Sequence, residues 1–125
     1  MLGAAGTRDP RALASIDEVA AALGRSEGLH CVAGYASGAG RPITDALAYL
    51  SARGAQRIGI ASYFLAPGLL HDRIVSAKDQ LSAVTARGQA TCAPITAAPL
   101  GDTPEIVAIT SRRIDQCLIA SEALV

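Results

Sequence analysis

The chain has 125 residues, half of them hydrophobic, and its 11 Lys and Arg residues balance its 11 Asp and Glu residues. This length predicts a single domain over residues 1–125 with one continuous core. The balanced charge argues against nucleic-acid binding. The longest nearly uncharged run, residues 58–70, is shorter than a membrane-spanning helix, so no membrane segment is expected.

The beginning of the chain carries no basic stretch followed by an apolar stretch, which a secretory signal needs. We therefore expect a cytoplasmic protein. The first predicted strand starts almost at Met1, which suggests either a late translational start or a domain cut from a longer protein.

Short β-type runs alternate with longer amphipathic segments, a pattern typical of βαβ units around a parallel sheet. The first unit has a strand at residues 2–5 and a helix at residues 10–23. Asp9 is its predicted cap, Pro10 its first residue and Gly24 its terminator. The other three strands are predicted at residues 29–35, 57–64 and 90–95, and the other three helices at residues 42–54, 68–87 and 103–118.

The three cysteines, Cys31, Cys92 and Cys117, are widely spaced and odd in number. This spacing fits neither a zinc site nor a disulfide framework. They are predicted to be reduced, buried thiols.

Ligands of an open parallel sheet bind beyond the carboxyl ends of its strands. There, the loop of Gly6, Thr7, Arg8 and Asp9 could bind an anion through backbone N–H groups at a helix start, with Arg8 adding a contact to a carboxylate. The simpler interpretation, which the loop alone favours, is that Thr7 and Asp9 cap the helix while Arg8 is solvated.

The chain contains two histidines. His71, in the first turn of the third predicted helix, could act as a metal ligand or base, although an exposed surface histidine is the more common case. His30 lies at the amino end of a strand, the wrong edge for a ligand site, and is given no role.

Three segments resemble one family. Residues 4–10, Ala-Ala-Gly-Thr-Arg-Asp-Pro, resemble the Ala-His-Gly-Ser/Thr-Arg-Asp-Pro opening of the CbiX-type sirohydrochlorin cobalto- and ferrochelatases. Residues 63–68 resemble the family's Phe-Leu-x-x-Gly-x-His segment, and residues 98–104 its Pro-Leu-Gly-x-x-Pro segment. The three matches follow one another in the family's order across nearly the whole chain.

The resemblance implies an α/β fold: a chelatase-like, flavodoxin-like three-layer sandwich with a four-stranded parallel sheet. It implies insertion of Co²⁺ or Fe²⁺, as the substrate metal, into a sirohydrochlorin-like tetrapyrrole for cobalamin or sirohaem synthesis, without an organic cofactor. It also implies a homodimer or pairing with a second chelatase domain. His71 becomes the candidate catalytic and metal-binding residue. The candidate substrate-binding residues are Gly6, Thr7, Arg8, Arg41 and Arg73.

The chain departs from the family pattern at three positions that carry chemistry. The family's first histidine falls on Ala5, and its second falls on Leu70, with His71 displaced by one residue. The acidic residue expected after the second strand falls near Ser37. These substitutions resemble the second half of two-domain chelatases, in which the other half retains the imidazoles.

Three interpretations follow. The first is a chelatase domain, or half of one, in which His71 is the imidazole nearest the metal. The second, favoured by Ala5, Ser37 and Leu70, is a catalytically inactive module that binds a tetrapyrrole or pairs with an active chelatase half. The third, a phospho-acceptor receiver or flavodoxin, lacks the acidic residues or the phosphate loop that it needs.

Overall fold

The structure, a computed structural model, describes residues 1–85 and 94–122. Strands and helices alternate throughout. The strands are β1 (Leu2–Ala4), β2 (Ala33–Tyr35), β3 (Gly59–Ser62) and β4 (Ile95–Thr96), and the helices are α1 (Pro10–Glu27), α2 (Ile43–Ala52), α3 (Leu69–Thr85) and α4 (Pro104–Glu122).

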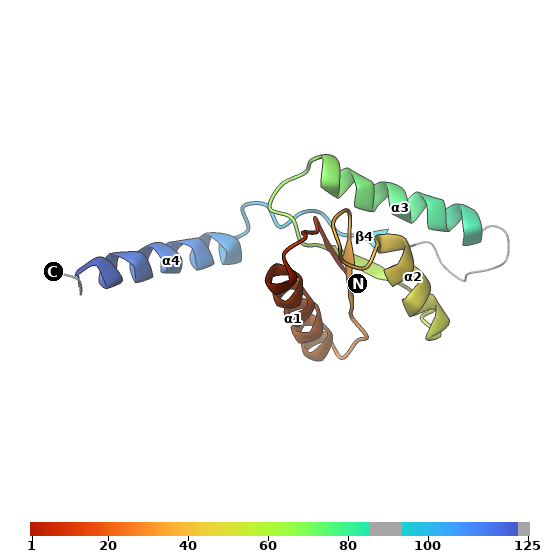
Figure 1. The fold of residues 1–125 in the computed structure, drawn as a ribbon, viewed down its shortest axis with the longest axis horizontal. Helices are drawn as coiled ribbons and strands as arrows, with labels where there is room; N and C mark the ends of the chain where they lie inside the picture. Colours follow the sequence, from red (N-terminus) through yellow and green to blue (C-terminus); the bar gives the residue numbers. More distant parts are fainter. Residues whose placement is uncertain (86–93, 123–125) are drawn as a thin grey trace.

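The four strands form one parallel sheet in the order β2-β1-β3-β4. Helix α1 lies on one face of this sheet, and α2 and α3 lie on the other (Figure 1). This arrangement follows from the right-handed connection of parallel strands, because the chain moves to one side of β1 after α1 and to the other side after α2. The predicted α/β architecture with a four-stranded parallel sheet is confirmed.

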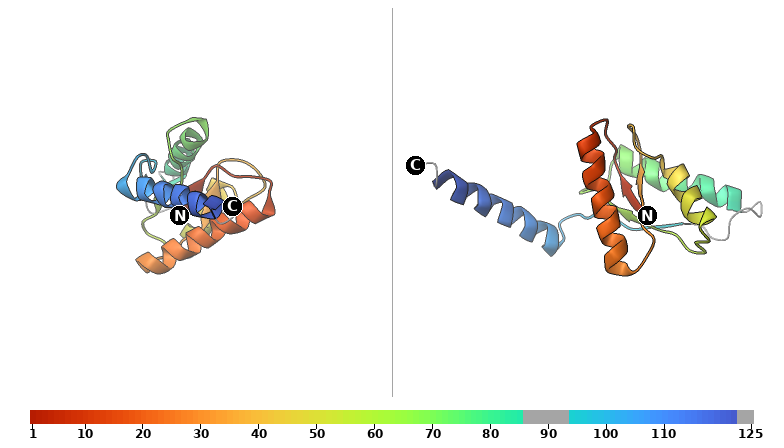
Figure 2. Two further views of the ribbon diagram at one scale, coloured as in Figure 1. Left: turned by 90° about the vertical axis from the view of Figure 1, so that its left-hand side faces the viewer. Right: turned by 60° about the horizontal axis from the view of Figure 1, so that its bottom comes forward.

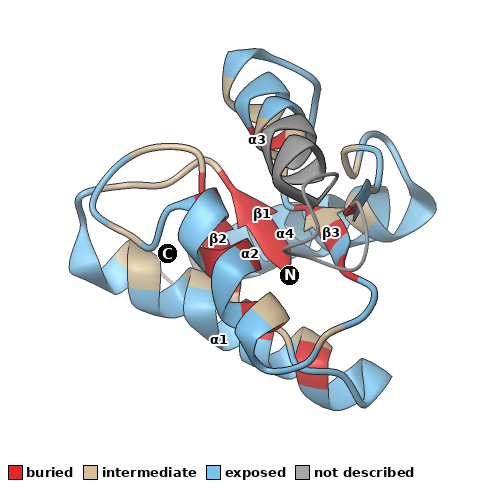
Figure 3. Ribbon diagram, turned by 90° about the vertical axis from the view of Figure 1, so that its right-hand side faces the viewer, coloured by how far each residue is buried: buried red, intermediate tan, exposed pale blue. Residues whose placement is uncertain are grey.

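Side chains of the central strands alternate between two apolar clusters. Leu2 and Ala4 of β1 belong to the cluster under α1, which also contains Tyr35. A Cβ on Gly3, between them, would lie 3.0 Å from Ile74 Cδ1 on the α3 side. Strands β1 and β2 are buried along their whole length (Figure 3). Small residues in β1 therefore let helices on both faces approach the sheet closely.

Helix α1 begins as predicted but ends later. Asp9 is its cap and Pro10 its first residue, whereas the predicted terminator Gly24 is a buried helical residue. A Cβ at Gly24 would lie 2.8 Å from the carbonyl oxygen of Leu29, so the missing side chain allows the returning chain to pack against the helix. Gly28 ends the helix instead, because its φ of 64° is left-handed and its N–H bonds to the Gly24 carbonyl.

The strands are shorter than predicted, because the apolar runs extend beyond the residues that pair. β1 and β2 pair over Leu2–Ala4 and Ala33–Tyr35, and β3 spans Gly59–Ser62. The predicted helix stop at Gly88 and most of the predicted strand at residues 90–95 lie outside the described residues.

Helix α4 extends away from the sheet (Figures 1 and 2). Its 19 residues leave the carboxyl edge of the sheet after β4. In the part of the chain that the structure describes, no helix is both long and apolar enough to cross a membrane.

Tyr35 ties β2 to α1. Its hydroxyl donates to Asp17 Oδ1 at 3.0 Å, and the Leu13 carbonyl oxygen, 3.3 Å away, is a second acceptor for the same proton. Burial, followed by the hydrogen bond and the negative charge of Asp17, raises the pKa of Tyr35 from 10.0 to about 12. The folded state therefore favours the neutral phenol.

The Tyr35→Phe substitution is expected to lower the free energy of unfolding at pH 8 by about 1–2 kcal/mol, because a hydrogen bond to a carboxylate is lost. The raised phenol pKa stabilises the fold, and this stabilisation is fully present below pH 10. It is lost as the pH rises toward 12. Between pH 10 and 11 the unmodified protein should therefore lose about 1 kcal/mol more than the variant. Urea titrations at each pH measure this, with the exposed Tyr63→Phe as the control, and equal pH slopes would contradict the expectation.

Candidate functional site

The carboxyl edge of the sheet has a switch point between β1 and β3. These strands are neighbours, but the loop after β1 leads to α1 on one face and the loop after β3 leads to α3 on the other. Parallel sheets bind ligands where adjacent loops diverge in this way. The chain places its candidate residues Gly6, Thr7 and Arg8 on the first loop and His71 in the first turn of α3, directly after the second loop.

The loop after β1 is bound tightly to the loop after β2. Ser37 Oγ donates to the Ala5 carbonyl at 2.8 Å, and the Ala39 N–H donates to the Thr7 carbonyl at 3.0 Å. Gly6 has a φ of 95°, and a Cβ there would lie 1.9 Å from the Ser37 carbonyl oxygen. Ser37, near which the family resemblance leads one to expect an acidic residue, therefore has a structural role in joining two loops.

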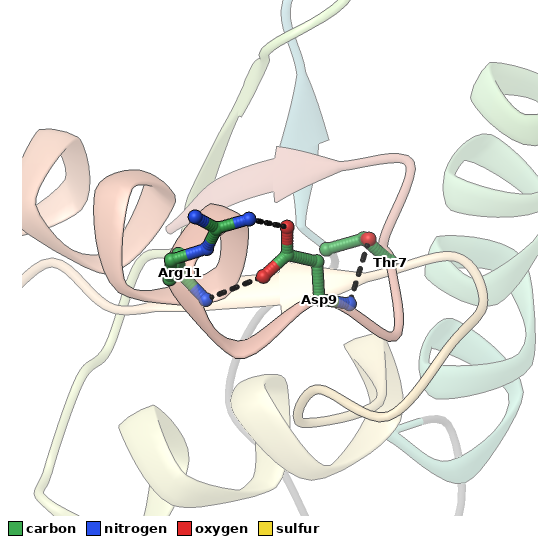
Figure 4. A network of polar contacts seen from close by, with 3 residues as sticks. All are labelled: Thr7, Asp9 and Arg11. Carbon is green, nitrogen blue, oxygen red and sulfur yellow. Dashed lines mark hydrogen bonds and ion pairs between the residues drawn. The ribbon is translucent and has the colours of Figure 1, made fainter.

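Polar groups at the start of α1 bond to one another (Figure 4). Thr7 Oγ1 accepts from the Asp9 N–H at 3.1 Å, and Asp9 Oδ1 accepts from the Arg11 N–H at 2.9 Å. The Arg11 guanidinium lies 3.5 Å from Asp9 Oδ2. Asp9 therefore caps the helix as predicted, whereas Thr7 bonds to the N–H of the cap residue and not to the helix itself. Arg8 is exposed, as the capping interpretation requires.

The loops after β3 and β4 form a second joined pair. The N–H groups of Leu100 and Gly101 donate to the carbonyls of Phe64 and Leu65 at 2.8 and 3.0 Å. Ser62 Oγ donates to the Ala97 carbonyl at 2.6 Å. The edge thus consists of two hydrogen-bonded pairs of loops, one on each side of the switch point between β1 and β3.

The side chain of His71 is largely buried, with only 12% of it exposed. The expectation of an exposed surface histidine is therefore wrong. Its ring packs edge-on against Phe64, in the loop after β3, at a centroid distance of 5.6 Å. Neither ring nitrogen has a hydrogen-bond partner among the described residues. Asp72 Oδ1, 3.7 Å from Nδ1, is within ion-pair range but too far for a hydrogen bond.

The three candidate arginines separate into two groups. Arg8 and Arg73 are exposed on the β1 loop and on α3, the two elements that flank the switch point. Arg41 instead stacks on Tyr49 of α2, with its guanidinium carbon 4.9 Å from the ring centroid. Arg41 is thus held on the loop after β2 by its contact with α2.

The sequence model of the CbiX family matches residues 1–117. The chain belongs to the CbiX family. It is therefore a sirohydrochlorin chelatase-family domain, as the three sequence segments predicted. Among curated proteins, none matches the chain significantly.

This CbiX domain does not assemble a metal-binding cluster from its described residues, where no three His, Cys, Asp or Glu side chains lie close enough together to hold an ion. Ala5 and Leu70 occupy the positions at which the family resemblance leads one to expect imidazoles. At the carboxyl edge of the sheet, the described part of the chain therefore offers the imidazole of His71 without a second one beside it.

Sequence reasoning missed two hydroxyls at this edge. Ser62 and Thr96 stand at the carboxyl ends of β3 and β4, and Thr96 Oγ1 is buried without a hydrogen-bond partner in the described structure. The sequence could have indicated both residues, since each is a hydroxyl residue at the carboxyl end of a predicted apolar strand, where ligands of a parallel sheet bind.

The cysteines of the CbiX domain differ from the prediction of buried thiols. Cys31 is half-buried and Cys117 is exposed, both as free thiols. Cys117 is exposed because α4 extends away from the sheet. Cys92 lies outside the described residues.

The His71→Leu substitution in this CbiX domain is expected to raise the free energy of unfolding by about 1 kcal/mol. It removes two buried nitrogens that lack partners and keeps an apolar contact with Phe64. Urea denaturation measures the change. The exposed His30→Leu is the matched control, with an expected effect near zero. A clear loss of stability on His71→Leu would show that the imidazole is satisfied in the folded protein.

Proposed function

We propose that this domain binds a sirohydrochlorin-like tetrapyrrole at the β1–β3 switch point and takes part in inserting Co²⁺ or Fe²⁺ into it, for cobalamin or sirohaem synthesis. The observation that carries the proposal is His71: an imidazole beside the ligand edge whose two nitrogens are buried and unpaired. A neutral imidazole can coordinate the incoming ion or accept a pyrrole proton.

The substrate's carboxylates suit the polar groups of this edge. Arg8 and Arg73, exposed on opposite sides of the switch point, would each hold a carboxylate. Gly6 allows the substrate to approach the backbone, and the Thr7 hydroxyl, which accepts from Asp9, can donate its proton to a carboxylate. Arg41, stacked on Tyr49, would reach the substrate only by leaving that ring.

A second candidate function is a catalytically inactive module that binds the tetrapyrrole or pairs with an active chelatase half. It is favoured by Ser37, whose hydroxyl joins two loops at the position expected for a carboxylate. Under either proposal the domain spans residues 1–125, acts in the cytoplasm and pairs with another chelatase domain or copy.

An anaerobic absorbance assay with sirohydrochlorin and Co²⁺ or Fe²⁺ separates the two. We expect insertion above the spontaneous rate, reduced at least about 10-fold by His71→Ala and unchanged by the matched His30→Ala. Exogenous imidazole should restore part of the His71→Ala rate. A shifted tetrapyrrole spectrum without insertion would identify the inactive module, and the absence of both signals would overturn the proposal.

A further inference from the structure

A cavity of about 350 Å³ lies at the amino edge of the sheet, opposite the edge that carries the candidate site. Two loops border this amino-edge cavity: the loop from α1 to β2, which contributes Leu29 and His30, and the loop from α2 to β3, residues 53–58. Met1 lies between the two loops, because β1 separates β2 from β3 in the sheet. A cavity of this volume is large enough to hold a small molecule.

The floor of the amino-edge cavity is apolar. Met1, Leu50 and Ile58 line it, and all three are buried members of the hydrophobic core between the sheet and α2 and α3. Ala55, which also lines the cavity, packs against the same cluster. A ligand with an apolar body would therefore remove core surface from water when it binds here.

The side of the cavity next to α2 carries positive charge. Arg53 and Arg57 line it, and none of the described lining residues is acidic. Arg57 is exposed and has no hydrogen bond or ion pair in the described structure, so all its N–H donors remain free for a ligand. Glu27 lines the adjoining cavity under α1 and accepts from Ser26 Oγ at 3.4 Å, and no ion pair links it to Arg57. The amino-edge cavity therefore favours an anion.

Arg53 is held in place by Tyr49 of α2. Its Nη1 donates to the Tyr49 hydroxyl oxygen at 2.9 Å, and its guanidinium carbon lies 5.4 Å from the ring centroid. The turn after α2 is fixed as well, since the N–H groups of Gly54 and Ala55 donate to the carbonyls of Ser51 and Leu50. Arg53 therefore loses little freedom when it binds an anion, and its other N–H donors remain available.

We propose that the amino-edge cavity binds a small organic anion, with an apolar body on the floor and a phosphate or carboxylate group against Arg57 and Arg53. Guanidinium groups bind both kinds of oxyanion through charge-assisted hydrogen bonds. An apolar floor strengthens these bonds, because it lowers the local dielectric constant beside the charges. The cavity lies at the other edge of the sheet from His71, and this inference does not depend on the proposed metal insertion.

Titrations of the full chain followed by ¹H–¹⁵N NMR test the site with four probes: phenyl phosphate, benzoate, inorganic phosphate and benzyl alcohol. We expect phenyl phosphate or benzoate to bind with a dissociation constant of about 1 mM or lower, and the tighter of the two identifies the anionic group. Inorganic phosphate lacks an apolar body and benzyl alcohol lacks a charge, so each should bind at least about 10-fold more weakly. Equal binding of either one, or no binding of any probe, would overturn the proposal.

Substituted chains locate the bound anion. Arg57→Gln should weaken binding of the aromatic anion at least about 10-fold, and it should leave the fold unchanged because Arg57 is exposed and unpaired. Arg112→Gln makes the same change on the exposed surface of α4 and should have no effect. The signals that shift should belong to residues 29–30 and 53–59. Equal effects of the two substitutions, or the largest shifts in the loop of residues 6–9, would place the anion elsewhere and overturn the proposal.

Discussion

The Gly6→Ala substitution is expected to lower the free energy of unfolding by about 4 kcal/mol, a large share of the total stability of a small domain. The added Cβ would lie 1.9 Å from the Ser37 carbonyl oxygen, and this contact is with backbone, which cannot rotate away. The φ of 95° adds strain for any residue with a side chain. The loops after β1 and β2 would have to separate.

Two further glycines distinguish the effect of the steric clash on stability from the effect of the backbone conformation. Gly54 has a φ of 85° with nothing within 4 Å of an added Cβ, so Gly54→Ala should cost only about 1–2 kcal/mol. Gly59, with ordinary φ and open space, should tolerate alanine at almost no cost. Urea denaturation of the three variants gives the comparison. If Gly6→Ala were no worse than Gly54→Ala, the contact between the loops would not be structural.

The amphipathic pattern predicted the four helices, because apolar residues recur along each of them at helical spacing. Leu13, Ile16 and Leu23 share one side of α1 and pack against the cluster under it. Gly24 was misjudged because a glycine that ends a helix and a glycine that admits a neighbouring chain look alike in sequence. Only the position of Leu29 distinguishes them.

The sequence predicted at which edge of the sheet the candidate residues lie, but not their contacts. The order of strands and loops determines that the Gly6 loop and the start of α3, which carries His71, lie at the same edge. The edge-on contact of His71 with Phe64, and of Arg41 with Tyr49, depends on side-chain packing between elements far apart in sequence. A lone histidine or arginine carries no local signal for such a partner.

The Ala5→His substitution is expected to raise the rate of metal insertion about 100-fold over that of the unmodified chain, the range in which one positioned acid–base group contributes. Along β1 the side chains of Leu2 and Ala4 face α1, whereas position 3 faces Ile74 of α3. The same alternation directs position 5 toward α3, the helix that carries His71. A second imidazole there would share an incoming ion with the first.

A matched pair of variants makes the Ala5→His experiment decisive. Ala5→Gln adds a polar side chain of similar size that is a poor metal ligand, and it should leave the insertion rate unchanged. Combining Ala5→His with His71→Ala should remove most of the gain, because the two imidazoles would act on the same ion. If folded Ala5→His protein inserts Co²⁺ no faster than Ala5→Gln, the β1–β3 edge is not where the metal enters. The domain would then be better understood as the tetrapyrrole-binding or pairing half of a chelatase.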